Sequence, residues 1–224
     1  MVFVGCVQRS GTHQFDSHPL ILVCSAALHT PYGQLASKRN LFMSDYRNWF
    51  VEGGTYFFTV VTCHRYPFFR DPSARRLLGE AFRQTQIDRP FELFAIVLLW
   101  DHLHCIWNLP PGDTDYPSRW KAIKDRFTAD WLDMGGHEEP VTDSQKRRGN
   151  RGIWQRRYRE HVVRDEDDLE KHFDYTHFNP VKHEYASRVV DWPWSSFHRY
   201  VKSGHYPADW GSSAQPHLDG LDFE

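Results

Sequence analysis

Between residues 55 and 178, the hydrophobic positions alternate between the two-residue period of a strand and the 3.6-residue period of a helix. Residues 55–62 (TYFFTVVT) are β-branched and aromatic, which is typical of a strand. Trp120, Ile123 and Phe127 recur at helical spacing. The pattern predicts strands over 55–62, 91–99, 102–109 and 152–163, and helices over 71–87, 117–132 and 165–178.

The element order is therefore β-α-β-β-α-β-α, which predicts a ferredoxin-like (split βαβ) α+β fold with one antiparallel sheet and helices on one face. Asp71-Pro72 and Asp165 are helix-start signals. Asn179-Pro180 should end the last helix, because the residue before a proline avoids the α region. Residues 135–150 are polar without apolar periodicity and are expected to form a loop.

The chain divides into three parts by pattern. Residues 1–42 carry few charges and no useful periodicity, so we expect a poorly structured extension or a misassigned start. Residues 43–211 form the expected domain, which opens with MSDYRNWFVEGGTYFFTVV. Residues 212–224 form an acidic C-terminal tail.

Composition narrows the classes of function. The formal net charge is −2, so any contact with nucleic acid depends on local basic patches rather than on the overall field. The four cysteines form no Cys-x-x-Cys pair, which argues against a zinc knuckle and fits a reducing cytoplasm. No apolar run is long enough to span a membrane, and residues 19–28 lack the basic flank of a signal peptide. A cytoplasmic protein is expected.

His102 and His104 flank Leu103 on a predicted strand, so both imidazoles point to the same face. Two neutral imidazoles in that arrangement supply half of a divalent-metal site. A pair of half-exposed surface histidines is the alternative interpretation.

Tyr175 and Asn179 lie one turn apart on a predicted helix. Asn179 offers an oxygen ligand and Tyr175 a phenolic nucleophile. Beside Phe173 and Phe178, however, a tyrosine is also a common core residue. Neither motif decides the function alone.

Together the two motifs resemble those of the HUH transposases that use a single tyrosine. The surrounding blocks are similar to those of the REP-associated tyrosine transposases, in the same order, from about residue 43 to residue 211. These blocks are MSDYRNWFVEGGTYFFTV, RPFELFAIVLLWDHLHCIWNLPPGD, SRWKAIKDRF, IWQRRYREHVVRDEDDL, DYTHFNPVKH and DWPWSSFHRYVKSGHYPADW.

The resemblance implies that His102, His104 and Asn179 bind Mg²⁺ or Mn²⁺ and that Tyr175 is the nucleophile. It implies cleavage of single-stranded DNA at REP-like hairpins, with a 5′-phosphotyrosine link and a free 3′-hydroxyl that allows rejoining. One departure is Trp100, because members of the family commonly carry proline before the acidic residue of this block.

Basic residues gather in two stretches that also hold aromatic side chains, a combination suited to single-stranded nucleic acid. For the tryptophans among them, a core position is the favoured interpretation. The candidate DNA-binding residues are Arg119, Lys121, Lys124, Arg126, Arg147, Arg148, Arg151, Arg156 and Arg157.

Two other functions fit the same residues. In a zinc-dependent hydrolase, His102 and His104 would bind the metal and water would replace the tyrosine as nucleophile. In a non-catalytic binding module, the protein would recognise structured nucleic acid, and binding would survive loss of both histidines.

Overall fold

The structure is a computed structural model that describes residues 50–212. The expected extension at 1–42 and nearly all of the expected tail at 212–224 lie outside these residues. In the described part of the chain, no helix is both long enough and apolar enough to cross a bilayer.

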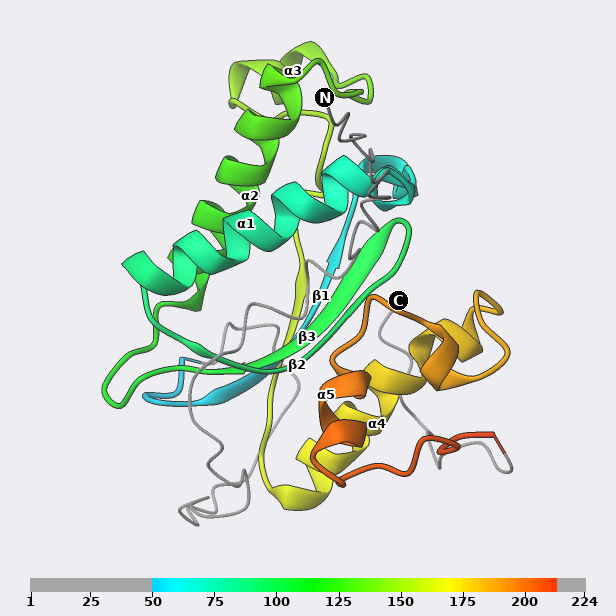
Figure 1. Ribbon diagram of the computed structural model, residues 1–224. Helices are drawn as coiled ribbons and strands as arrows, with labels where there is room; N and C mark the ends of the chain where they lie inside the picture. The colour runs from blue at the N-terminus through cyan, green and yellow to red at the C-terminus, as the bar shows by residue number, and fades with distance from the viewer. Residues whose placement is uncertain (1–49, 213–224) are drawn as a thin grey trace, which may run out of the picture.

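A four-stranded antiparallel sheet forms the centre of the molecule (Figure 1). Its spatial order, β2-β3-β1-β4, is that of a ferredoxin-like fold, so the predicted fold class is confirmed. The strands are β1 (Thr55–Val61), β2 (Glu92–Leu98), β3 (His102–Asn108) and β4 (Arg159–Val162).

Helices cover both faces of this sheet, so the expectation that they lie on one face only is wrong. On one face, α1 (Pro72–Asp88) packs beside α2 (Tyr116–Asp133). On the other face, α4 (Glu166–Lys182) contacts β2 and β3 (Figure 1). The strands bury apolar side chains on both sides, which lets α4 pack on the face opposite α1 and α2. The shorter elements are η2 (Cys63–Arg65), η3 (Phe68–Arg70), α3 (Asp143–Arg147), η4 (Val189–Asp191) and α5 (Phe197–Lys202).

Successive side chains along each strand point alternately to the two faces of the sheet. Tyr56 and Phe58 belong to the cluster between the sheet and the α1–α2 pair, where Trp107 stacks on Trp120 with ring centroids 4.6 Å apart. Phe57 points the opposite way and packs with residues of α4. Because both faces are covered, polar side chains on the α4 face of the sheet are removed from water.

The predicted helix starts are confirmed. Asp71 accepts a hydrogen bond from the backbone N–H of Ser73 at 2.6 Å, and Pro72 occupies the first position of α1. Asp165 caps α4 by accepting from the backbone N–H of Asp168 at 2.8 Å.

The predicted end of α4 at Asn179 is wrong. The helix continues through Pro180 to Lys182, although an interior proline costs about 3 kcal/mol. Packing offsets this cost, since Phe178 is buried with Val189 and Phe197 from the segment after the helix, and the Pro180 carbonyl accepts from the N–H of Tyr185 at 2.9 Å. The sequence rule failed because these contacts lie outside the helix.

The fourth predicted strand is also shorter than expected. Only Arg159–Val162 pairs continuously with β1, while Trp154 forms an isolated bridge with Thr62. Between these two pairings the continuous ladder is interrupted, although the Gln155 N–H still donates to the Val61 carbonyl at 3.0 Å. The expected loop over 135–150 contains the five-residue helix α3, which Thr142 and Gln145 start with reciprocal capping hydrogen bonds.

His177 gives the fold a testable pH dependence. It is fully buried, and its Nε2 lies 2.9 Å from the Ser196 hydroxyl oxygen. Burial, reinforced by the charges of Arg199 and His198, lowers the pKa of His177 to about 3. An unfolded histidine titrates near pH 6.5. Between that pH and about pH 3, the unfolded chain therefore binds a proton at this residue that the folded state does not bind.

The free energy of unfolding should therefore decrease as pH falls from 7 to 4, by about 3 kcal/mol from this group alone. Denaturant unfolding of the wild type and His177→Gln at both pH values measures the effect. The variant should show a shallower pH dependence, and equal dependences in the two proteins would contradict the assignment.

Candidate active site

The two histidines of β3 lie side by side on the α4 face of the sheet. Their ring centroids are 5.0 Å apart, and both side chains are fully buried. Leu103 between them packs in the cluster on the other face. The strand alternation expected from the sequence therefore brings His102 and His104 together.

A hydrogen bond at Nδ1 orients each imidazole. His104 Nδ1 lies 2.9 Å from the hydroxyl oxygen of Thr59, its partner in the β1–β3 register. His102 Nδ1 lies 2.7 Å from a carboxylate oxygen of Asp101. In both rings Nε2 is buried without a hydrogen-bond partner. Such an arrangement leaves one ring nitrogen directed and available for a metal.

Helix α4 brings the other two predicted residues to the same place. The Tyr175 ring meets the His104 ring edge-on at 5.2 Å, and the His183 ring meets His102 at 5.1 Å. Asn179 lies between Tyr175 and His183 on the same side of the helix, one turn from each. Its side chain is fully buried, and neither its amide oxygen nor its nitrogen has a hydrogen-bond partner.

These orphaned atoms fit a divalent cation. A buried polar group without a partner costs about 1–3 kcal/mol, and here two imidazole nitrogens and an amide share one layer. Burial, followed by the charge of His102, lowers the pKa of His104 well below its usual value, so this ring is neutral. Neutral imidazoles and an amide oxygen are suitable ligands for such an ion.

Known proteins match this chain over most of its length. An Escherichia coli (strain K12) REP-associated tyrosine transposase is 42% identical over 168 residues, which cover 75% of this chain and 91% of that protein. A Haemophilus influenzae protein (strain ATCC 51907 / DSM 11121 / KW20 / Rd), assigned provisionally to the same family, is 40% identical over 178 residues, covering 80% and 99%.

A solved structure of a REP-associated tyrosine transposase bound to a REP hairpin superposes with a TM-score of 0.64. It is 38% identical and covers 81% of this chain and 96% of its own. The chain belongs to the REP-associated tyrosine transposase family. It is thus an enzyme of the tyrosine transposase class. No protein-family model matches the chain.

In this transposase, Thr59 contacts His104 and Asp101 contacts His102, and the sequence analysis predicted neither contact. The Asp101 carboxylate is nearly buried and also accepts from Arg65 Nη1 at 3.1 Å. Burial alone would raise its pKa, but the hydrogen bonds and charges of His102 and Arg65 outweigh burial and lower it. The sequence could have indicated Asp101 as a partner of His102, because the two residues are adjacent. The contact of Thr59 with His104 depends on the register between β1 and β3, which the sequence does not show.

Trp100, where this transposase departs from the common family pattern, packs at the tip of the β2–β3 hairpin. Its ring lies 4.8 Å from that of Trp192 and 5.0 Å from that of Trp194. The hairpin still closes, with the Leu99 N–H donating to the His102 carbonyl at 2.9 Å. The substitution therefore leaves the histidine strand in register, and two of the C-terminal tryptophans pack on the domain.

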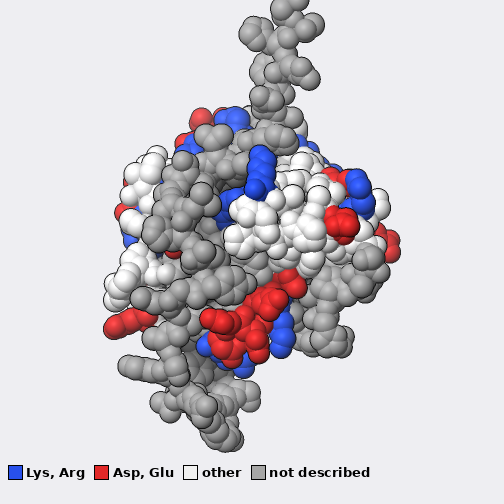
Figure 2. All heavy atoms as spheres, turned by 60° about the horizontal axis from the view of Figure 1, so that its bottom comes forward, with Lys and Arg blue, Asp and Glu red and all other residues white. Residues whose placement is uncertain are grey.

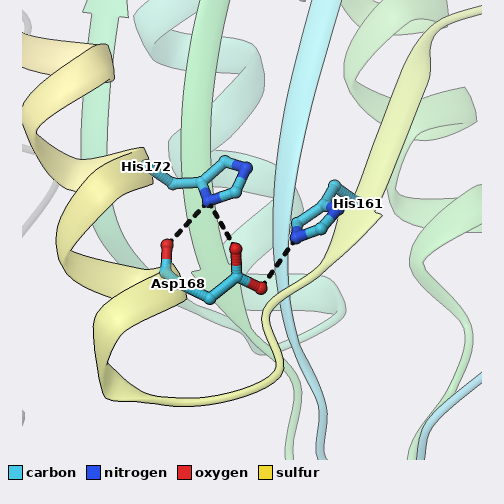
Figure 3. A group of neighbouring side chains, drawn as sticks. All are labelled: His161, Asp168 and His172. Atoms are coloured by element: carbon cyan, nitrogen blue, oxygen red, sulfur yellow. Dashed lines mark hydrogen bonds and ion pairs between the residues drawn. The ribbon is translucent and has the colours of Figure 1, made fainter. Parts of the chain in front are cut away.

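His161, Asp168 and His172 form a second cluster of possible metal ligands beside this site (Figure 3). The Asp168 carboxylate accepts from His161 Nε2 at 2.8 Å and from the backbone and side chain of Arg164 at 3.0 and 3.1 Å. Burial would raise the Asp168 pKa, but these bonds and that of His172 lower it strongly. Because protein donors already occupy the carboxylate, we assign the cluster a structural role joining β4 to α4.

The candidate DNA-binding residues of α2 are mostly engaged within the protein. Arg119 is buried, with Nη2 2.7 Å from a carboxylate oxygen of Asp113 and bonds to three backbone carbonyls, so the structure favours a structural role for it over contact with DNA. Lys124 is half-buried and burial lowers its pKa to about 8. Arg126 pairs with Asp88, and the exposed Lys121 pairs with Asp125.

The remaining candidates are better placed for DNA. Arg147, Arg148, Arg156 and Arg157 are exposed, whereas Arg151 is held by Glu138 at 2.7 and 2.5 Å. Arg159 was not among the residues expected to bind DNA. It is exposed and lies opposite Thr59 in the β1–β4 register, and Thr59 in turn lies opposite His104 in the β1–β3 register.

Not every face of the molecule suits a polyanion. The first turn of α4 carries Glu166, Asp167 and Asp168, and it lies at the bottom of Figure 1. On the face turned forward in Figure 2, acidic side chains gather in one group. This acidic turn is therefore an unfavourable surface for a phosphate backbone.

The role of Asp101 can be tested through metal binding. Asp101→Asn keeps the shape but removes the charge that orients His102, and the affinity for Mn²⁺ should fall about 10- to 100-fold. Calorimetric titration of the purified protein measures this affinity. Asp191→Asn, which breaks the surface ion pair with Arg188, is the matched control and should bind Mn²⁺ like the wild type. Equal affinities in all three proteins would show that Asp101 does not support metal binding through His102.

Arg119→Met should lower the free energy of unfolding by about 2 kcal/mol, because it removes the donor that pairs with the Asp113 carboxylate and with three backbone carbonyls. Lys121→Met, on the exposed side of the same helix, should change it little. Denaturant unfolding compares the two variants. Similar stabilities would restore Arg119 as a candidate for DNA binding.

Proposed function

We propose that this transposase is a metal-dependent single-stranded DNA endonuclease and strand transferase, with Tyr175 as its nucleophile. The observation that carries the proposal is the contact of the Tyr175 ring with His104, beside buried histidine and asparagine atoms that have no protein partner. A nucleophile beside ligand atoms that no protein group occupies is what metal-assisted phosphoryl transfer needs.

His102, His104 and Asn179 would hold Mg²⁺ or Mn²⁺, and an amide ligand favours these harder ions over zinc. When bound, such an ion polarises the phosphate and neutralises charge that develops on its oxygens. The protein's own contribution is rigidity, because Thr59 and Asp101 fix the imidazoles while the core fixes the tyrosine ring.

In cleavage, the Tyr175 oxygen forms a bond to phosphorus and the bond from phosphorus to the 3′ oxygen breaks. The phenolic proton passes to water, and the departing 3′ oxygen takes a proton from water, so the step is balanced. The downstream fragment remains on the tyrosine through its 5′ phosphate, as a phosphodiester, and the upstream fragment leaves with a free 3′-hydroxyl. Attack by another 3′-hydroxyl reverses the step and joins two strands.

The substrate proposed is a single strand that carries a REP-like hairpin, since a 38% identical relative has been solved bound to a REP hairpin. The exposed Arg147, Arg148, Arg156 and Arg157 are suited to follow its phosphates. Arg159 lies closest in register to the histidines and would act nearest the cleaved bond.

Covalent capture tests the proposal. Purified protein with Mg²⁺ or Mn²⁺ is incubated with labelled hairpins from the genome that encodes it, and a denaturing gel is examined for a protein–DNA adduct. The wild type should form the adduct and Tyr175→Phe should not, because only the hydroxyl is lost. Tyr66→Phe, a change of the same size at an exposed position, should retain it.

Two results would overturn the mechanism. Cleavage that is equal in the wild type and Tyr175→Phe, without an adduct, would indicate a metal-dependent hydrolase with water as nucleophile. Tight binding of a hairpin that is never cleaved with either metal would indicate a binding module.

A further inference from the structure

Lys182 places its ammonium group against the hydroxyl of Tyr175. Its Nζ donates a hydrogen bond to the tyrosine Oη at 3.3 Å and lies 5.0 Å from the centre of the ring. The two residues are seven positions apart on α4, which is close to two full turns, so they share one side of the helix.

This contact depends on the helical turn that follows Pro180. If α4 ended at Asn179, as residue preferences suggest, Lys182 would lie outside the helix and off the Tyr175 side. Instead α4 ends at Lys182, and buried packing around Phe178 and Val189 maintains the extra turn. The fold thus keeps an unfavourable proline and gains a cation at the tyrosine oxygen.

The surroundings of Lys182 strengthen the interaction of its charge with the Tyr175 oxygen. Tyr175 is buried, whereas Lys182 is exposed and reaches the hydroxyl from the solvent side. A charge that contacts a buried oxygen is screened less than one in open water. DNA entering from solvent would meet the ammonium and the phenolic oxygen together.

We propose that Lys182 is a catalytic residue that holds the Tyr175 oxygen in line with the phosphate and stabilises the negative charge this oxygen carries during transfer. The inference rests on the proposed function. In cleavage, the oxygen–phosphorus bond forms as the phosphorus–3′ oxygen bond breaks. In rejoining, the incoming 3′-hydroxyl loses its proton to water as its oxygen bonds to phosphorus. The tyrosine oxygen leaves with the electron pair and then takes up a proton from water. The ammonium contacts the same oxygen in both directions.

The test compares Lys182→Met, Lys182→Arg and the wild type in single-turnover reactions on the hairpin that the wild type binds most tightly. Lys171→Met, which removes an exposed lysine from the same helix, is the control. We expect Lys182→Met to slow adduct formation and rejoining on the order of 100-fold each. Lys182→Arg should recover a substantial part of both rates, because it restores the charge.

Hairpin affinity, measured by fluorescence anisotropy, and thermal unfolding are followed in parallel. Both should stay near wild type in every variant, which separates a chemical role from a structural one. Wild-type rates in Lys182→Met, with or without weaker hairpin binding, would overturn the inference and reduce Lys182 to a phosphate contact. Equal losses in Lys182→Met and Lys182→Arg would also overturn it. Absence of an adduct in the wild type would instead refute the proposed function, and this inference with it.

Discussion

The antiparallel pairing of β1 with β3 is the constraint on which the candidate site depends. Its register sets Thr59 opposite His104 and Val61 opposite His102, in the middle of a sheet that is covered on both faces. A shift of one residue would turn both histidines into the apolar layer beneath α1 and α2. Phe58, Leu103 and Trp107 fill that layer, so hydrophobic packing on one face fixes the position of the polar groups on the other.

Some polar groups on the α4 face of the sheet lower the stability of the fold, because they are buried without a hydrogen-bond partner. Two imidazole nitrogens and the whole amide of Asn179 are buried without protein partners. Thr59 and Asp101 satisfy the Nδ1 atoms, and Asp168 joins His161 to His172 next to Phe57. In the proposed mechanism, the unsatisfied atoms of His102, His104 and Asn179 lie where a cation would bind, as in sites whose lower stability accompanies function.

Helix α4 connects this layer to the solvent. Its first turn is anchored to β4 through Asp168, and its last turn is held by the cluster around Phe178 and Phe197. The segment between the two anchors carries Tyr175 and Asn179, so neither residue relies on a loop for its position. Such two-ended support suits a nucleophile that must stay aligned through cleavage and rejoining.

The sequence by itself determined the order of the elements, the helix starts at Asp71 and Asp165, and the shared faces of His102 with His104 and of Tyr175 with Asn179. These features follow from local periods and capping chemistry, which need no knowledge of distant residues. Only the tertiary structure decided that α4 lies across the histidines, that Thr59 orients one of them, and that Arg119 is buried beside Asp113. It also decided that α4 passes through Pro180 to Lys182. The periodicity of a helix or strand shows which of its side chains share a face. The residues that this face contacts are decided by packing between segments far apart in the chain.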